Sequence, residues 1–114
     1  MEDRQWVPVV IKHQGPEFEK DVYETYEVSN YCNIRNVKTG VVSVNKNYCF
    51  TFRGANKSHK HQTFRVCLAS FFPDKIPENI NDYDVDHIDG NYYNMTLANL
   101  QWMHKSDHAR KRMN

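Results

Sequence analysis

A chain of 114 residues is long enough for one compact domain and too short for two independent cores of ordinary size. Its 39% hydrophobic content, four glycines and four prolines are typical of a globular protein and exclude long disordered tracts. The formal net charge is only +1, and the three cysteines form no Cys-x-x-Cys pair. We therefore expect one folded unit with reduced thiols, and neither a disulfide framework nor a zinc ribbon.

The charges are strongly segregated along the chain. Residues 28–73 carry seven basic and no acidic residues, whereas residues 1–27 carry three basic and seven acidic ones. Residues 74–91 carry one basic and six acidic residues, and residues 92–114 carry four basic and one acidic. Because each cation placed on a phosphate releases a counterion, the stretch 28–73 is a candidate phosphate-facing surface. The alternative is an ordinary solvated face.

The sequence also indicates the cellular location of the protein. No run of about eighteen apolar residues occurs, and acidic residues stand near the start where a secretory signal needs basic ones. We therefore expect a soluble, intracellular protein without a membrane partner.

The first part of the chain is expected to form antiparallel strands. An apolar run at residues 6–11 predicts one short strand, and a charged loop follows around residues 15–17. Alternating apolar and polar side chains predict hairpin strands at residues 23–30, 33–38 and 41–44, with a turn at 38–40.

The middle of the chain combines a second strand pair with a helix. The strands are predicted at residues 48–53 and 62–66, joined by a polar, basic loop at 54–61. Apolar side chains at helical spacing predict a helix over residues 64–72, ended by Pro73, as the spine of the core. Residues 74–84 are expected to form an acidic loop.

The closing section is predicted to contain two strands and a helix. The strands are expected at residues 85–88 and 100–103, with a turn at 89–91 after the first. A terminal helix follows, with Ser106 as its N-cap. Basic residues near the end of this helix suit its dipole: Arg110, Lys111 and Arg112.

Four side chains in this section match the chemistry of phosphodiester hydrolysis: Asp86, His87, Asn99 and His108. The reaction needs an activated water, a cation to neutralise charge growing on the phosphate, and a group that stabilises the leaving oxygen. The four residues come together only if the two strands pair and the helix packs across them.

Residues 83–110 resemble the HNH module of phage and intron homing endonucleases. The specific matches are Val-Asp-His-Ile-Asp-Gly-Asn at 85–91 and Ala-Asn-Leu-Gln-Trp at 98–102. Upstream, residues 23–35 are similar to the short nuclease-associated DNA-binding motif that often precedes this module, and residues 66–72 resemble its connecting helix. Cys32 stands where the upstream motif usually has glycine, and Arg65 where the connecting helix commonly begins with histidine.

The resemblance implies an α+β fold, with a small antiparallel β N-terminal lobe followed by a ββα-metal (HNH) motif. The corresponding division of the chain is a DNA-binding lobe at residues 1–63, and a connecting helix with the nuclease motif at residues 64–114.

The resemblance also implies a role for each site residue. Asp86 and His108 would hold one divalent metal ion, and His87 would be the general base that takes a proton from the attacking water. Asn99 would steady the metal loop and orient the base. The residue chemistry agrees, since a histidine can accept a proton at neutral pH, and one carboxylate with one imidazole leaves open metal positions. We expect Mg²⁺ or Mn²⁺, although imidazole also admits Ni²⁺, Co²⁺ or Zn²⁺.

The implied activity is hydrolysis of double-stranded DNA that leaves 5′-phosphate and 3′-hydroxyl ends, in a bacterial cytoplasm or another DNA-containing compartment. A monomer with one site nicks one strand, and a double-strand break needs a homodimer or two sequential events. The expected DNA contacts are Arg35, Lys38, Arg53, Lys57, Lys60, Arg65, Arg110 and Lys111.

Several alternatives stay open. The chain is either a nuclease, a non-cleaving DNA-binding protein that keeps the fold, or a domain that binds zinc only to hold its structure. His104 is a rival metal ligand, whereas Asn91 and Asn94 are expected in the turn and loop. His59 and His61 are either a second metal site or part of a solvated, phosphate-touching loop.

Overall fold

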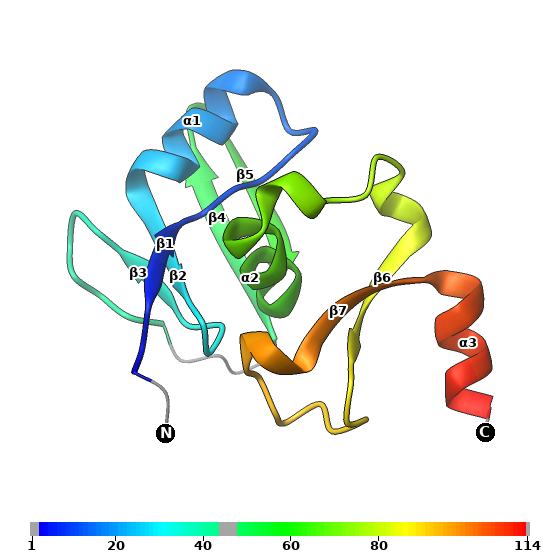
Figure 1. Ribbon diagram of the computed structural model, residues 1–114. Helices are drawn as coiled ribbons and strands as arrows, with labels where there is room; N and C mark the ends of the chain where they lie inside the picture. Colours follow the sequence, from blue (N-terminus) through cyan, green and yellow to red (C-terminus); the bar gives the residue numbers. More distant parts are fainter. Residues whose placement is uncertain (1–2, 44–47, 114) are drawn as a thin grey trace.

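Three small antiparallel sheets lie around one central helix in the computed structural model, which describes residues 3–43 and 48–113 (Figure 1). This helix, α2 (Thr63–Phe71), contacts strands of all three sheets. A helix surrounded in this way needs apolar or small side chains on almost every side. Its buried residues are Thr63, Phe64, Val66, Cys67, Leu68, Ala69 and Ser70. The predicted α+β class, with this helix as the spine of the core, is confirmed.

The N-terminal sheet has the strand order β1-β2-β3, and both pairs are antiparallel. Its central strand places Val28 opposite Val7 on one side and opposite Ile34 on the other. The strands are β1 (Trp6–Pro8), β2 (Tyr26–Ser29) and β3 (Ile34–Asn36). The predicted strand at 41–44 contributes one bridge, from Val42 to Arg35, and Val44 lies outside the described residues.

Helix α1 (Pro16–Thr25) corrects the expectation of a loop followed by a strand. Proline at the first helical position and two acidic residues in the first turn are good starting signals. Phe18 and Val22, four residues apart, form the buried face that packs on the second sheet. Gly54 makes this approach possible, because a Cβ there would lie 2.7 Å from the Phe18 ring.

The second sheet is a hairpin of β4 (Cys49–Gly54) and β5 (Lys57–Gln62). The predicted loop at 54–61 is therefore mostly a strand, and the predicted strand at 62–66 is wrong because α2 begins at Thr63. Strand β5 has no apolar residue, so its sequence pattern gives no strand signal. Its inner face is made by His59 and His61, whose rings lie beside Phe18 and Phe52 respectively.

The third sheet confirms the two predicted closing strands. Strands β6 (Tyr83–His87) and β7 (Leu100–His104) are antiparallel, and helix α3 (Lys105–Met113) packs on both. Two short 3-10 turns occur in this region: Ile80–Asp82 lies within the predicted acidic loop, and Pro73–Lys75 overlaps its start.

The predicted N-cap of α3 needs a correction. Ser106 lies inside the helix, and its backbone N–H donates to Nδ1 of His104 over 3.2 Å. The Ser106 hydroxyl lies 2.8 Å from the same nitrogen. The imidazole of His104 therefore fills the capping position that a serine or aspartate usually takes.

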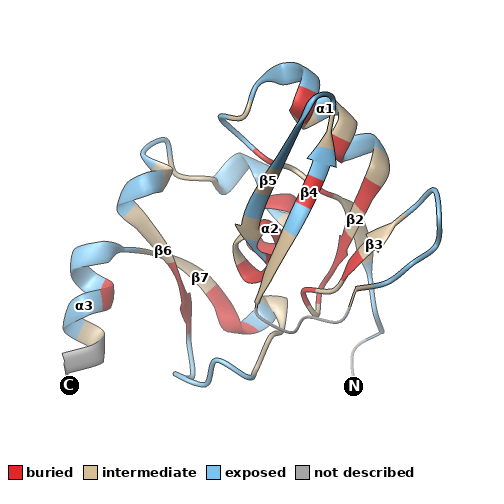
Figure 2. Ribbon diagram, turned by 180° about the vertical axis from the view of Figure 1, so that it is seen from behind, coloured by how far each residue is buried: buried red, intermediate tan, exposed pale blue. Residues whose placement is uncertain are grey.

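One hydrophobic cluster connects the N-terminal sheet with the closing section. It runs from Val9 and Val28 through Phe64 to Val85 and Leu100. Figure 2 shows the buried residues gathered on α2 and on the segments of β2, β6 and β7 that face it. The division of the chain at residues 63 and 64 stays a prediction, and the core is shared across it.

None of the described helices has the length and apolar character needed to cross a membrane.

The turn between β2 and β3 places Cys32 in the left-handed region, at a φ of 63°. Its backbone N–H donates to the carbonyl of Ser29 over 2.9 Å, and its side chain is fully buried. Left-handed backbone favours glycine, which explains why the related motif usually has glycine at this position. The turn forms here with a non-glycine residue and carries the associated strain.

We predict that Cys32→Gly is more stable than Cys32→Ala by about 1 kcal/mol, because alanine keeps the strained backbone and glycine relieves it. Urea unfolding of both variants measures the difference. Cys67 in α2 is the matched control, since there alanine should exceed glycine by about 1 kcal/mol. Equal stabilities at position 32, or a more stable alanine variant, would contradict the role of the backbone.

His61 predicts a pH dependence of stability. Burial, followed by the charges of His59 and Arg65, lowers the pKa of His61 from 6.5 to about 4. Between these values the unfolded chain holds a proton at His61 that the folded protein does not. Its contribution to the free energy of unfolding therefore falls from pH 6.5 to about pH 4. Thermal unfolding between pH 4 and 8 should show a shallower acid decline for His61→Gln than for the parent, and identical slopes would refute this prediction.

Candidate active site

The pairing of β6 with β7 sets the position of the predicted site residues. Asp86 lies opposite Gln101, and His87 lies opposite Leu100. Helix α3 lies beside this pair in Figure 1, and it brings Nε2 of His108 within 3.6 Å of Oδ1 of Asp86. Two side chains that are 22 positions apart in the sequence therefore meet at one point.

Asp86 is a buried carboxylate, with 2% of the residue exposed. Its Oδ2 accepts hydrogen bonds from Lys111 Nζ over 2.7 Å and from Gln101 Nε2 over 2.9 Å. Burial raises the pKa of Asp86, but these two hydrogen bonds, and then the charges of Lys111 and His108, outweigh it and leave the pKa below its usual value. The carboxylate is therefore ionised at neutral pH.

His108 is held from its other side by a second carboxylate. Its Nδ1 lies 3.1 Å from Oδ2 of Asp84, which stands two residues before Asp86 on β6. In the neutral tautomer that carries its proton on Nδ1 and donates it to Asp84, Nε2 is the nitrogen whose lone pair faces Asp86. This carboxylate–imidazole pair is the arrangement that commonly orients a histidine ligand toward a metal.

His87 has a dry environment. Only 2% of the residue is exposed, and neither ring nitrogen has a hydrogen-bond partner among the described residues. The ring lies 5.1 Å from that of Phe64 and 4.8 Å from that of Tyr92. Burial lowers the pKa of His87, with an opposing influence from the carboxylates of Asp86 and Asp89. The imidazole is therefore neutral at pH 7 and has a nitrogen free to accept a proton.

Asn99 holds the loop that follows β6. Its Oδ1 accepts from the N–H of Asp89 over 3.0 Å, and its Nδ2 donates to Asp89 Oδ1 over 3.0 Å and to the carbonyl of Asn94 over 3.1 Å. These bonds tie the loop to Asn99, and its role in steadying a metal loop stays a prediction. Hydrogen bonds of this side chain to His87 are absent from the described part of the chain, so orientation of that ring comes from its aromatic neighbours.

The loop itself is built from asparagine and aspartate side chains. Asp89 accepts from the Asn91 backbone over 2.8 Å and from the Asn94 amide over 2.8 Å. Both bonds lower the pKa of Asp89, and the bond from Asn94 has the larger effect. Asn91 and Asn94 thus lie in the turn and loop, where they were expected. Gly90 supplies the positive φ of 76° that the turn needs.

His104 ends β7 opposite Tyr83, three pairs along the strand from Asp86 and Gln101, and uses its Nδ1 in the cap of α3. Within residues 3–43 and 48–113, no three His, Cys, Asp or Glu side chains converge as metal ligands. A closed zinc site of the structural kind would need four ligands, and the described residues do not supply it.

The expected DNA contacts divide into two groups. Five of these side chains are engaged inside the chain. Arg35 pairs with Glu27 and stacks 4.2 Å from the Trp6 ring. Arg65 donates to the carbonyls of Tyr83 and Ile80 over 2.8 and 2.7 Å. The other three are Lys57 with the carbonyl of Gln14, Arg110 with Asp107, and Lys111 with Asp86.

The remaining three expected contacts are exposed, and no ion-pair partner for them is found among the described residues: Lys38, Arg53 and Lys60. Arg53 and Lys60 lie on the outward face of the β4–β5 hairpin. They alternate there with Thr51 and Ser58, their cross-strand partners, which are exposed on the same face. Two positive charges are therefore accessible on the outward face of this hairpin.

Three site residues were missed by sequence reasoning or given another role: Asp84, Gln101 and Lys111. For Asp84 and Lys111, the spacing from a predicted site residue could have indicated a place in the site. Asp84 stands two residues before Asp86 and so shares its face of the strand. Lys111 stands three residues after His108 and so shares its face of the helix. Gln101 becomes visible only when the register of β6 and β7 is known.

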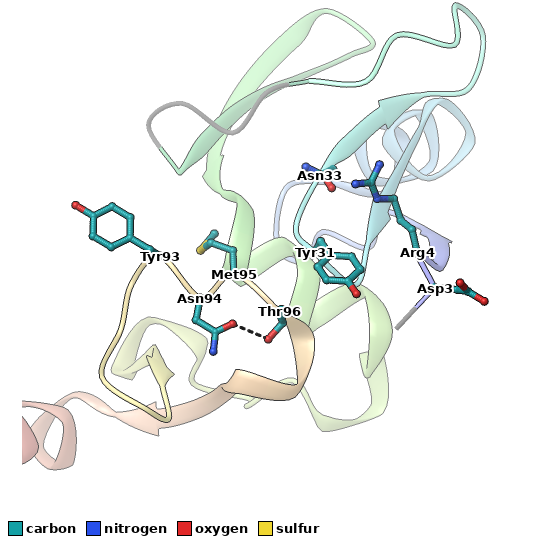
Figure 3. A pocket seen from close by; sticks show the side chains of 8 residues that line it. All are labelled: Asp3, Arg4, Tyr31, Asn33, Tyr93, Asn94, Met95 and Thr96. Atoms are coloured by element: carbon teal, nitrogen blue, oxygen red, sulfur yellow. Dashed lines mark hydrogen bonds between the residues drawn. The ribbon is translucent and has the colours of Figure 1, made fainter. Parts of the chain in front are cut away.

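A cavity of about 610 Å³ lies beside the loop that Asn99 holds (Figure 3). One wall comes from residues 93–96 of this loop and the other from Arg4, Tyr31 and neighbouring residues of the N-terminal part. Asp86, His87 and His108 do not line it. The cavity is therefore not part of the candidate active site.

Known proteins are similar to this chain in sequence and in fold. Residues 65–110 match the model of the HNH endonuclease family. The chain is 30% identical over 95 residues to an uncharacterized HNH endonuclease, L245, of Acanthamoeba polyphaga mimivirus, and the match covers 77% of this chain and 28% of the viral protein. The chain thus spans less than a third of that relative's length.

The fold is similar to a solved structure that describes DNA binding and cleavage by the HNH homing endonuclease I-HmuI. The TM-score is 0.67 at 22% sequence identity, over 96% of this chain and 57% of that one. Residues 65–110 therefore match the HNH endonuclease family, and the chain has a fold similar to that of the solved homing endonuclease.

Proposed function

We propose that the protein is a metal-dependent DNA endonuclease that hydrolyses phosphodiester bonds. The observation that carries the proposal is the approach of His108 Nε2 to Asp86 Oδ1, at 3.6 Å, next to a buried histidine whose ring nitrogens have no hydrogen-bond partner among the described residues. In this proposal Asp86 and His108 hold one divalent ion, and His87 is the general base.

The donor set fits such an ion. His108 Nε2 and Asp86 Oδ1 lie 3.6 Å apart, close enough for both to be ligands of one ion. The hydrogen bond from His108 to Asp84 supports Nε2 as the free ligand atom. One carboxylate and one imidazole suit Mg²⁺ or Mn²⁺ and leave positions for water and phosphate oxygens. When bound, the ion would neutralise the charge that grows on the phosphate.

The proposed base gains its reactivity from its surroundings. Neutral His87 accepts the proton of the attacking water through whichever ring nitrogen is unprotonated, while Phe64 and Tyr92 keep the imidazole from turning away. Burial lowers the pKa of His87 and so keeps the base unprotonated at neutral pH. Asn99 contributes indirectly by holding the loop that carries Tyr92.

The proposed substrate is double-stranded DNA. The β4–β5 hairpin supports this choice, because its outward face carries Arg53, Lys60 and hydroxyl side chains, and residues 49–62 include no carboxylate. A two-stranded ribbon has the right width for the major groove. In this proposal residues 1–63 supply DNA binding and residues 64–114 supply cleavage, with nicking as the default outcome for a monomer.

A non-cleaving DNA-binding protein is the second candidate. The observation in its favour is the ammonium group of Lys111, which lies on the carboxylate proposed to hold the metal. A protein that used this ion pair only to stabilise the fold would bind DNA and leave it intact.

The nuclease proposal predicts metal-dependent nicking of supercoiled plasmid with Mg²⁺ or Mn²⁺, abolished by EDTA. His87→Ala should lower the nicking rate at least about 100-fold, because it removes the base. His104→Ala is the matched control, since it removes a histidine that caps α3. It should cost about 1 kcal/mol of stability but keep the rate within a few-fold. A parent protein that binds the plasmid but never cuts it under any divalent metal would favour the non-cleaving candidate.

A second prediction concerns Asp84. Asp84→Asn should weaken Mn²⁺ binding by roughly 10-fold or more, because His108 loses the carboxylate that orients it. Calorimetric titration with Mn²⁺ measures the affinity. Asp82→Asn is the control, because it removes an exposed acid close by without contact to His108. Equal affinities for the two variants would show that Asp84 does not support the metal site.

A further inference from the structure

Lys111 has a role that the proposed chemistry leaves open. We propose that Lys111, together with Gln101, restricts Asp86 to binding a metal through one oxygen, and so selects Mg²⁺ or Mn²⁺ against Ca²⁺. This inference rests on the proposed function, since it requires that Asp86 is a metal ligand. Lys111 is then a specificity-determining residue that acts through Asp86.

The argument begins with the two oxygens of Asp86, which have different surroundings. Oδ2 accepts from Lys111 Nζ at 2.7 Å and from Gln101 Nε2 at 2.9 Å. A carboxylate oxygen has two lone pairs, so both acceptor positions of Oδ2 are filled. Oδ1 is the oxygen that faces His108 Nε2. Only Oδ1 is available to share a cation with that imidazole.

The ammonium group is anchored by more than the carboxylate. Lys111 Nζ also lies 3.2 Å from the carbonyl of Ile88 and 3.4 Å from the carbonyl of His87. Three oxygens from the end of β6 thus surround it. Lys111 follows His108 by three residues on α3, so one helix face presents both groups to the strand. These contacts hold the Lys111 side chain in one position, unlike that of a flexible surface lysine.

Burial makes the restriction effective. The Asp86 side chain is 4% exposed, so water cannot easily replace a lost partner on Oδ2. The hydrogen bond from Lys111 is charge-assisted, which makes it stronger than one between neutral groups. Rotation of the carboxylate toward a two-oxygen contact would break this bond and leave an ammonium group without its anion.

Divalent ions differ in how many oxygens of a carboxylate they coordinate. Ca²⁺ takes six to eight oxygen ligands and often binds both oxygens of a carboxylate, whereas Mg²⁺ demands octahedral geometry and usually keeps several waters. A carboxylate with one oxygen occupied still serves Mg²⁺ and Mn²⁺. It denies Ca²⁺ the two-oxygen contact. The arrangement therefore favours the smaller ions without any additional ligand.

The test compares Ca²⁺ and Mn²⁺ affinities by calorimetric titration in the absence of DNA, for the parent and for Lys111→Met. The methionine keeps the length of the side chain but has no donor. We expect the affinity for Ca²⁺ relative to Mn²⁺ to rise about fivefold or more in Lys111→Met. Arg110→Met is the matched control, because it removes one positive charge from the same helix without contact to Asp86. It should leave the ratio at the parent value.

The outcomes separate this inference from the proposed function. If the parent binds neither ion, the proposed metal site fails. If the parent binds Mn²⁺ but Lys111→Met has the ratio of the parent or of Arg110→Met, only the role of Lys111 is overturned. Lys111→Arg, which keeps donors for Oδ2, should retain the parent ratio. If Lys111→Met does not fold by circular dichroism, Gln101→Leu frees the other lone pair of Oδ2 and should shift the ratio in the same direction. An unchanged ratio in Gln101→Leu would overturn the inference.

Discussion

A charged carboxylate inside a protein must find partners, and the site is organised around this requirement at Asp86. The residue is 2% exposed, and its neighbours come from β7 as Gln101 and from α3 as His108 and Lys111. These contacts hold the helix across the strand pair. The loss of one partner would leave an incompletely paired buried charge, which is strongly destabilising. The electrostatics that dock α3 therefore also assemble the candidate metal ligands beside the candidate base.

The predictable parts of the fold are those in which local pattern and tertiary packing agree. Strands β6 and β7 carry motif residues, β6 adjoins the turn at 89–91 that indicated it, and the apolar spacing of α2 indicates a core helix. Helix α1 was missed because its few apolar positions run into the alternating pattern of β2. Strand β5 was missed because its inner face is made of histidines, whose burial against phenylalanine rings depends on the completed hairpin.

In the candidate site, too, some residues could be predicted from the sequence and others could not. Spacing and residue type were sufficient to select Asp86, His87, Asn99 and His108, because each has a distinctive position in the motif. Their supporting contacts could not be predicted with equal ease. Those of Gln101 and Lys111 depend on strand register and on the docking of α3. Several basic residues expected on DNA, Arg35 and Arg65 among them, instead have intramolecular partners that only the folded chain provides.

The central claim is that one divalent ion binds between Asp86 and His108. The most direct measurement replaces that ion with Fe²⁺, adds ascorbate and peroxide, and maps the resulting backbone cuts in the protein by mass spectrometry. Hydroxyl radicals act close to their source, so our account predicts cuts near residues 86–88 and near His108, suppressed by excess Mg²⁺ and lost in Asp86→Asn. Cuts centred on His59 and His61, or an unchanged pattern in Asp86→Asn, would contradict it.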